Sequence, residues 1–206
     1  MKIIAILSQK GGTGKTTMAL HLAVEAERAG VSAVIVDLDP QASATSWSDL
    51  REIDTPAVVS AQAARLGQVL ATAQEQGAEL AIIDTAPHAE SAALAAARAA
   101  DLILIPCRPA ILDLTAIGTT IDLVRIAGRP AAVVLNAVPP RGTLAYEAGE
   151  AVAGYSVTLS PVSLGHRSAF VQALTTGETA QEYEPKGKAA QEIIALYTWV
   201  CAQVDM

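Results

Sequence analysis

The chain has 206 residues, of which 51% are hydrophobic and only 17% are charged. This composition can fill a sizeable core and excludes an intrinsically disordered chain. The formal net charge of −7 at pH 7 argues against a protein whose whole surface binds nucleic acid, although it is compatible with a local basic patch. Cys107 and Cys201 form neither a CxxC pair nor a metal-ligand spacing, so we expect two reduced thiols.

The first apolar run, residues 3–7, is too short for a secretory signal or a membrane span. We therefore expect a cytoplasmic protein. No repeat, linker or low-complexity tail interrupts the sequence, and we expect one domain over residues 1–206.

Short, continuously apolar segments alternate with longer segments of helical spacing. The apolar segments are residues 3–7, 33–36, 80–83, 102–105 and 131–135. Such runs are typical of strands buried on both faces of a parallel sheet. Helical spacing covers residues 16–29, 61–76, 89–99, 114–127, 168–175 and 188–204, and Gly30, Gly77 and Gly128 stand where left-handed helix ends are expected. The pattern predicts a doubly wound α/β fold, a mostly parallel sheet with helices on both faces.

Ligands of such sheets bind beyond the carboxyl ends of the strands. There the first predicted strand runs into a glycine-rich loop followed by a helix, residues 9–17 (QKGGTGKTT). Glycines let backbone N–H groups surround a phosphate, Lys15 would reach its outer oxygens, and the Thr16 hydroxyl would bind Mg²⁺. The strict pattern G-x-x-x-x-G-K-[ST] requires glycine where this chain has Gln9. The nucleotide-binding candidates in this loop are Lys10, Gly11, Gly12, Thr13, Gly14, Lys15, Thr16 and Thr17.

The loop departs from the strict pattern at Gln9, and the sequence around it matches a different version of the motif. KGGTGKTT at residues 10–17 resembles the deviant Walker A motif of the ParA/MinD ATPase family. VDLDPQ at residues 36–41 resembles the switch I of that family, and IIDTAP at 82–87 resembles its Walker B and switch II. The resemblance continues through IPCRPAILDL at 105–114 and VLN at 134–136, over roughly the first two-thirds of the chain. It implies a P-loop NTPase fold that binds ATP and Mg²⁺.

The resemblance also implies roles for single residues. Lys10 would be the signature lysine, which reaches across an ATP-bound homodimer to the phosphates of the other subunit and acts with Lys15 in catalysis. Asp39 would activate the attacking water. Asp84 would hold the Mg²⁺ water shell as the Walker B carboxylate, and Asp37 would lie near the same metal. For Asp37, capping of the next helix is the alternative.

Asn136 would contact the purine, unless it is an ordinary turn residue at a strand end. Pro161, after a predicted strand near residues 155–159, would also line the base.

ParA-type members are ATP-dependent switches that position plasmids or chromosomes, and a ParB-like or cargo adaptor stimulates their hydrolysis. The chain resembles the small members without an N-terminal helix-turn-helix. Positioning of a protein cargo, such as an enzyme microcompartment, is the closest alternative. A small-molecule enzyme of the dethiobiotin synthetase kind is a further one.

Non-specific DNA binding, with association to the nucleoid, would need a basic surface. The candidates are Arg167, Lys186 and Lys188. In contrast, residues 189–206 contain no Lys or Arg and include Glu192 and Asp205, so we expect no attachment of this tail to an anionic membrane.

Overall fold

The computed structural model describes residues 1–206 and contains one sheet of seven strands. The strands are β1 (Lys2–Ile6), β2 (Ala33–Asp37), β3 (Ala57–Ser60), β4 (Leu80–Asp84), β5 (Leu102–Cys107), β6 (Ala131–Leu135) and β7 (Thr158–Leu159). Their order across the sheet is β3-β2-β4-β1-β5-β6-β7, and every neighbouring pair is parallel. The predicted doubly wound fold is confirmed, and all strands present their carboxyl ends at the same edge.

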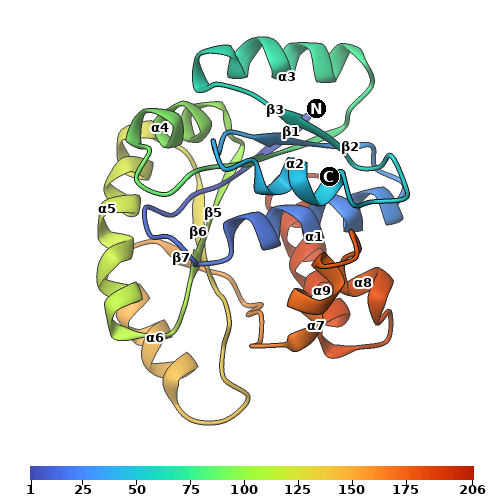
Figure 1. The fold of residues 1–206 in the computed structure, drawn as a ribbon. Helices are drawn as coiled ribbons and strands as arrows, with labels where there is room; N and C mark the ends of the chain where they lie inside the picture. The colour runs from blue at the N-terminus through green and yellow to red at the C-terminus, as the bar shows by residue number, and fades with distance from the viewer.

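Helices cover both faces of the sheet (Figure 1). They are α1 (Lys15–Arg28), α2 (Ser43–Ser48), α3 (Leu66–Glu75), α4 (Glu90–Ala99), α5 (Ile111–Ala127), α6 (Leu144–Ala153), α7 (Ser168–Leu174), α8 (Ala180–Tyr183) and α9 (Lys188–Gln203). One buried cluster joins one face of the sheet to α1, α2, α7, α8 and α9. A second cluster joins the other face to α3, α4, α5 and α6.

Alternation along each strand explains the two clusters. Ile4 and Ile6 of β1 belong to one cluster, whereas Ala5 and the following Leu7 belong to the other. A strand covered on both faces needs apolar residues at every position, and this is why the sequence showed continuous apolar runs.

The structure also contains elements that the sequence pattern did not predict. These are β3, α2, α6 and α8; all except α6, which has ten residues, are six residues or shorter. β3 is a mostly exposed edge strand of four residues, and β7 has only two. The helix predicted over residues 61–76 begins as a 3₁₀ turn, Ala63–Arg65, before α3. The predicted left-handed ends are confirmed, because Gly30, Gly77 and Gly128 have φ of 81°, 94° and 66°.

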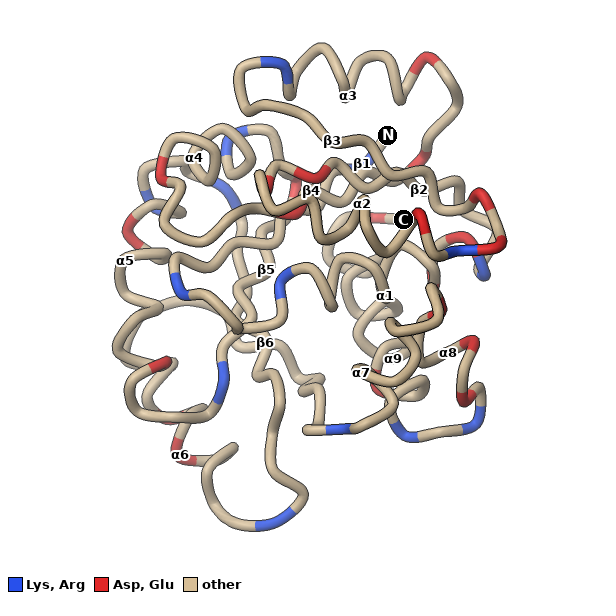
Figure 2. Tube along the Cα trace, in the orientation of Figure 1, with Lys and Arg blue, Asp and Glu red and all other residues tan.

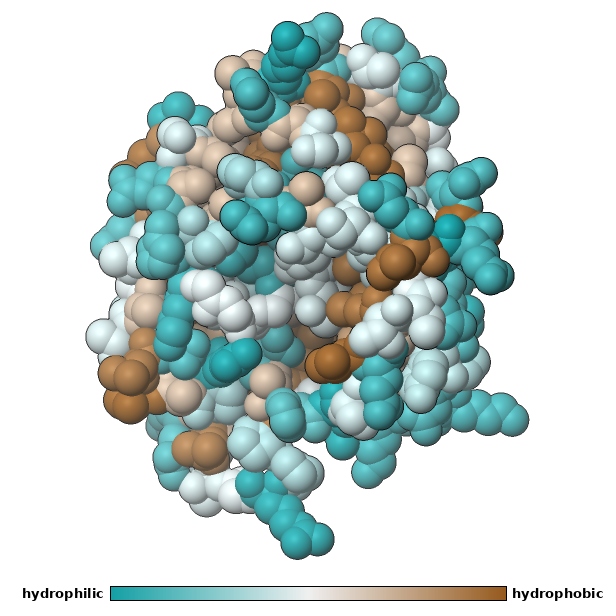
Figure 3. Space-filling model, viewed as in Figure 1, coloured by the Kyte–Doolittle hydropathy of each residue, from teal (hydrophilic) through white to brown (hydrophobic).

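A cavity of about 400 Å³ lies between α3 and the sheet, where Val34, Val59 and Val69 are part of its wall. Figure 3 shows the corresponding apolar patch at the top of the molecule. Ser32 and Ala78, which also line it, precede β2 and β4, so the cavity lies at the amino ends of these strands. Ligands of this fold class bind at the opposite edge. No helix of the structure combines the length and apolar character that a bilayer crossing requires.

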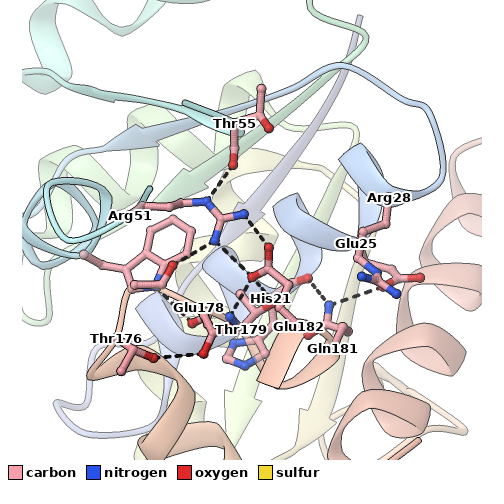
Figure 4. A network of polar contacts seen from close by, with 12 residues as sticks. His21, Glu25, Arg28, Arg51, Thr55, Thr176, Glu178, Thr179, Gln181 and Glu182 are labelled. Atoms are coloured by element: carbon pink, nitrogen blue, oxygen red, sulfur yellow. Dashed lines mark hydrogen bonds and ion pairs between the residues drawn. The ribbon is translucent and has the colours of Figure 1, made fainter. Parts of the chain in front are cut away.

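A buried polar network attaches α8 to α1 (Figure 4). The ring of His21 is fully buried; its Nδ1 donates to the Thr17 carbonyl (2.7 Å) and its Nε2 accepts the N–H of Ala180 (3.0 Å). The Gln181 amide donates to the His21 carbonyl (2.8 Å) and to the Glu25 carboxylate (3.3 Å). Because Ala180 N–H can only donate, the imidazole must be neutral here.

Arg51 makes the second half of this network (Figure 4). Its guanidinium donates two hydrogen bonds to the Glu182 carboxylate (2.6 and 3.0 Å) and further bonds to the carbonyls of Gly177 (2.8 Å) and Thr55 (2.7 Å). It also lies 4.8 Å from the centroid of the Trp47 ring. The segment before α8 is thereby tied to the end of α2.

The neutral His21 predicts a specific acid sensitivity. Burial lowers the pKa of His21 from 6.5 to about 4, against the opposing effects of the Thr17 bond and Glu182. The unfolded chain therefore binds more protons between these values, and the free energy of unfolding should fall by about 3 kcal/mol as pH drops from 6.5 to 4. Urea unfolding across this range, on the native chain and on His21→Gln, measures it. A parallel loss of stability in both proteins would contradict the prediction.

Candidate active site

The glycine-rich loop joins β1 to α1, and its shape depends on two glycines. Gly12 and Gly14 have φ of 72° and 94°, a region that other residues rarely adopt. A Cβ on Gly14 would lie 2.2 Å from Nδ2 of Asn136, which donates to the Thr13 carbonyl (2.7 Å). The loop is therefore fastened to the end of β6. Helix α1 begins with no side-chain cap and no acidic residue in its first turn, so its N–H groups are free to bind an anion.

Lys15 lies buried at the start of α1. Its Nζ contacts the Lys10 carbonyl at 3.4 Å and forms no ion pair. Burial lowers the pKa of Lys15, while the charges of Asp84 and Asp39 act in the opposite direction. A buried ammonium with one carbonyl contact has donors left for the oxygens of a phosphate.

Asp84 ends β4 and is fully buried. Its Oδ2 accepts the Thr16 hydroxyl at 2.6 Å, and its Oδ1 is buried without any hydrogen-bond partner. Burial raises the pKa of Asp84 to about 7, although the Thr16 bond opposes the shift. Hydroxyl and carboxylate oxygens are the ligands that Mg²⁺ prefers. No group of three or more His, Cys, Asp or Glu is arranged to hold a metal ion.

Asp37 is the residue of β2 that pairs in register with Asp84. Its Oδ1 accepts the N–H of Asp39 (3.0 Å), and its Oδ2 accepts those of Ala44 (3.2 Å) and Thr45 (3.4 Å) in the first turn of α2. Both oxygens therefore serve the backbone. Asp37 therefore caps α2, the alternative considered for it, and it also lies beside Asp84 at the strand ends, so its predicted place near the metal stays a prediction.

Asp39 is held beside this cap and is half-buried. Its Oδ1 accepts the N–H of Gln41 (2.9 Å). Asp39 contributes to the electrostatics of both Lys15 and Asp84, so it stands at the same edge of the sheet.

Lys10 is paired within its own chain. Its Nζ lies 2.9 Å from Oδ2 of Asp113, in the first turn of α5. The side chain of Lys10 is 36% exposed and that of Asp113 only 10%. The neighbouring Ile111 and Leu112 are 76% and 74% exposed, the highest values among the large apolar side chains of the chain.

A cavity of about 450 Å³ opens beside the loop. Its walls include Gly12, Gly14 and Thr17 of the loop and α1, Arg108 after β5, Asn136, and residues 165–167. Asn136 is a wall residue whose amide is bonded to the Thr13 carbonyl, and its contact with the purine stays a prediction. Pro161 is not a wall residue, and its contact with the base also stays a prediction. Arg108 and His166 are wall residues that the sequence reasoning did not select, although Arg108 lies within the IPCRPAILDL segment, residues 105–114.

The DNA-binding candidates occupy different environments. Arg167 donates to the Glu192 carboxylate of α9 through both Nε (3.2 Å) and Nη2 (2.5 Å), and it lines the cavity. Its charge is therefore compensated by Glu192, and the DNA contact of Arg167 stays a prediction. Lys186 and Lys188 are exposed near the start of α9. Figure 2 shows Lys and Arg positions interspersed with Asp and Glu positions along the chain.

Comparison with known proteins agrees with this geometry. The model of the CobQ/CobB/MinD/ParA nucleotide binding domain matches residues 4–179, and the chain belongs to this ParA/MinD-type ATPase family. It is 34% identical to the maintenance of carboxysome distribution protein A of Gloeobacter kilaueensis, over 99% of this chain and 94% of that protein.

Two solved structures share the fold. The septum site-determining protein MinD of Pyrococcus horikoshii, complexed with Mg-ADP, has a TM-score of 0.80 at 21% identity, over 97% of this chain and 95% of that one. Apo McdA of Cyanothece has a TM-score of 0.77 at 20% identity, over 95% of this chain and 99% of that one.

The contact between Gly14 and Asn136 can be tested by stability. Gly14→Ala should lose roughly 1–2 kcal/mol for its left-handed φ and more for the clash with the Asn136 amide. Gly30→Ala is the matched control, because Gly30 has φ of 81° and nothing within 4 Å of the added Cβ. Thermal unfolding should show the larger loss for Gly14→Ala and a partial recovery in Gly14→Ala/Asn136→Ala. Equal losses at the two glycines would show that the amide does not constrain the loop.

Proposed function

We propose that this protein is an ATP-dependent switch that hydrolyses ATP to ADP and positions an intracellular cargo. The observation that carries the proposal is the pairing of Thr16 with the buried Asp84, whose second oxygen is free, directly after a loop that contains buried Lys15. These residues suit the binding of a nucleoside triphosphate with Mg²⁺. The Mg-ADP bound to the similar MinD structure supports the same ligand class.

Each side chain then has a physical task. Lys15 and the N–H groups of the loop and first turn of α1 bind the phosphates. Thr16 would bind Mg²⁺ directly and Asp84 would hold its water shell, and the ion would supply positive charge beside the outer phosphates. Asp39, half-exposed at the same edge, orients the attacking water. Asp37 fixes the backbone of Asp39 through its hydrogen bond and so acts as a positioning residue.

We propose that Lys10 exchanges partners during the cycle. In the isolated chain it pairs with Asp113, and the Lys10 end of this pair is 36% exposed and accessible to another anion. The triphosphate of a second subunit carries more charge and can compete for the ammonium. Ile111 and Leu112, exposed beside Asp113, suit burial against that subunit. An ATP-bound homodimer is therefore expected, with charge from Lys10 supplied in trans.

The cargo is the least constrained part of the proposal. The relative whose name refers to carboxysome distribution is 34% identical over 99% of this chain, whereas a chromosome partitioning protein is 26% identical over 95%, and this difference favours a protein assembly as the cargo. An adaptor protein would then stimulate hydrolysis. DNA is a candidate for the matrix, meaning the surface on which the switch moves its cargo. The exposed Lys186 and Lys188 of two subunits would bind it weakly. A small-molecule enzyme is the less favoured alternative, because it would leave Lys10 without its role in trans.

Asp39→Ala tests the cycle. It should bind ATP, fail to hydrolyse it, and remain a dimer with Mg²⁺, whereas ADP should give the monomer. Light scattering after size exclusion measures the mass, and phosphate release measures hydrolysis. Lys15→Ala is the control that should lose nucleotide binding. Hydrolysis by Asp39→Ala at the native rate would remove Asp39 from catalysis, and a monomer in every nucleotide would favour the small-molecule enzyme.

The same dimer tests the matrix. A random-sequence DNA duplex should bind the Asp39→Ala dimer at low salt, with an affinity that falls steeply as salt rises. Lys186→Gln/Lys188→Gln should weaken this binding, and Lys2→Gln/Arg28→Gln changes the net charge equally as a control. If the dimer ignores DNA at low salt, the matrix is another surface.

A further inference from the structure

Arg108 is a cation of the cavity wall that neither the sequence reasoning nor the proposed mechanism uses. It follows β5 directly, and its side chain lies against the glycine-rich loop: Nη2 is 3.8 Å from the position of a Cβ on Gly12. The residue is exposed and lines the cavity of about 450 Å³ together with Asn136.

The guanidinium of Arg108 has no carboxylate or carbonyl partner. The neighbouring cations differ. Lys10 pairs with Asp113, and Arg167, on the same wall, pairs with Glu192. Arg108 is therefore the uncompensated arginine of this cavity, next to a loop that is itself built for anions.

Hydrogen bonds hold the backbone around Arg108 in place. They therefore fix the point from which its side chain projects. The N–H of Ala110 donates to the Arg108 carbonyl (2.8 Å), and the preceding Cys107 is buried. The carbonyl of Cys107 accepts the N–H of Asn136 (2.8 Å). Arg108 thus projects from a fixed point between the loop and Asn136.

We propose that Arg108 binds the phosphate chain of the nucleotide held by its own subunit. The inference rests on the proposed function. It adds a cation that contacts the nucleotide of its own subunit, besides Lys10, which contacts the nucleotide of the other subunit. A guanidinium offers paired N–H groups that match two phosphate oxygens, whereas an ammonium offers a single point charge. Arg108 is therefore a binding residue for the phosphates of ADP and ATP alike.

The test measures MgADP affinity by isothermal titration calorimetry, because the ADP form is expected to be monomeric and reports cis contacts alone. Arg108→Gln should weaken MgADP binding by about ten-fold or more, the usual effect of losing a charged hydrogen bond. Arg108→Lys should recover only part of the loss. Arg98→Gln, an exposed arginine of α4 outside the cavity, changes the net charge equally and should bind like the native chain.

The outcomes separate this inference from the proposed function. If the native chain binds neither MgADP nor MgATP, the proposed function fails. If the native chain binds and Arg108→Gln binds equally well, only the role of Arg108 fails. A loss seen with MgATP in the dimer but absent with MgADP would show that Arg108 reaches the partner's nucleotide, and this would overturn the assignment in cis. A weaker salt dependence of MgADP affinity in Arg108→Gln would support it.

Discussion

The site depends on a carboxylate that the fold buries without fully satisfying it. Burial of an ionised carboxylate is costly unless hydrogen bonds or a cation compensate for it. Asp84 receives one hydroxyl, from Thr16, and its other oxygen has no partner. That contact links the end of β4 to the first turn of α1. It therefore places the proposed Mg²⁺ position beside the phosphate loop. The raised pKa of Asp84 expresses the same incomplete compensation.

Around this carboxylate, the parallel sheet gathers the ends of strands that are distant in sequence. Asp37 and Asp84 pair in register on β2 and β4, and the Asn136 amide reaches from the end of β6 to the loop after β1. Each of these side chains also holds backbone: Asp37 caps α2 and Asn136 fixes the Thr13 carbonyl. The shape of the loop is therefore set by its neighbours as much as by its own glycines.

The four cations near the site differ in what compensates them. Lys15 is buried and contacts a carbonyl, Lys10 has an exchangeable carboxylate, Arg167 is bound to α9, and Arg108 has no partner. These environments suit separate tasks. Lys15 suits permanent phosphate binding and Lys10 a contact that changes with assembly. Arg167 supports the cavity wall, and Arg108 is free to contact a phosphate. A net charge of −7 thus coexists with a locally cationic site.

The sequence by itself determined the parallel α/β fold, since short apolar runs of strand length alternate with segments of helical spacing. It also determined the phosphate loop, since the glycines and Lys15 are adjacent in the chain. It did not find α2 or β3, whose short segments have too few apolar residues to show a period. Only the tertiary structure assigned Asp37 to a cap, Arg167 to Glu192 and Lys10 to Asp113. The physical reason is that a charged side chain's role depends on which partner lies within a few ångströms, and those partners come from segments far away in the sequence.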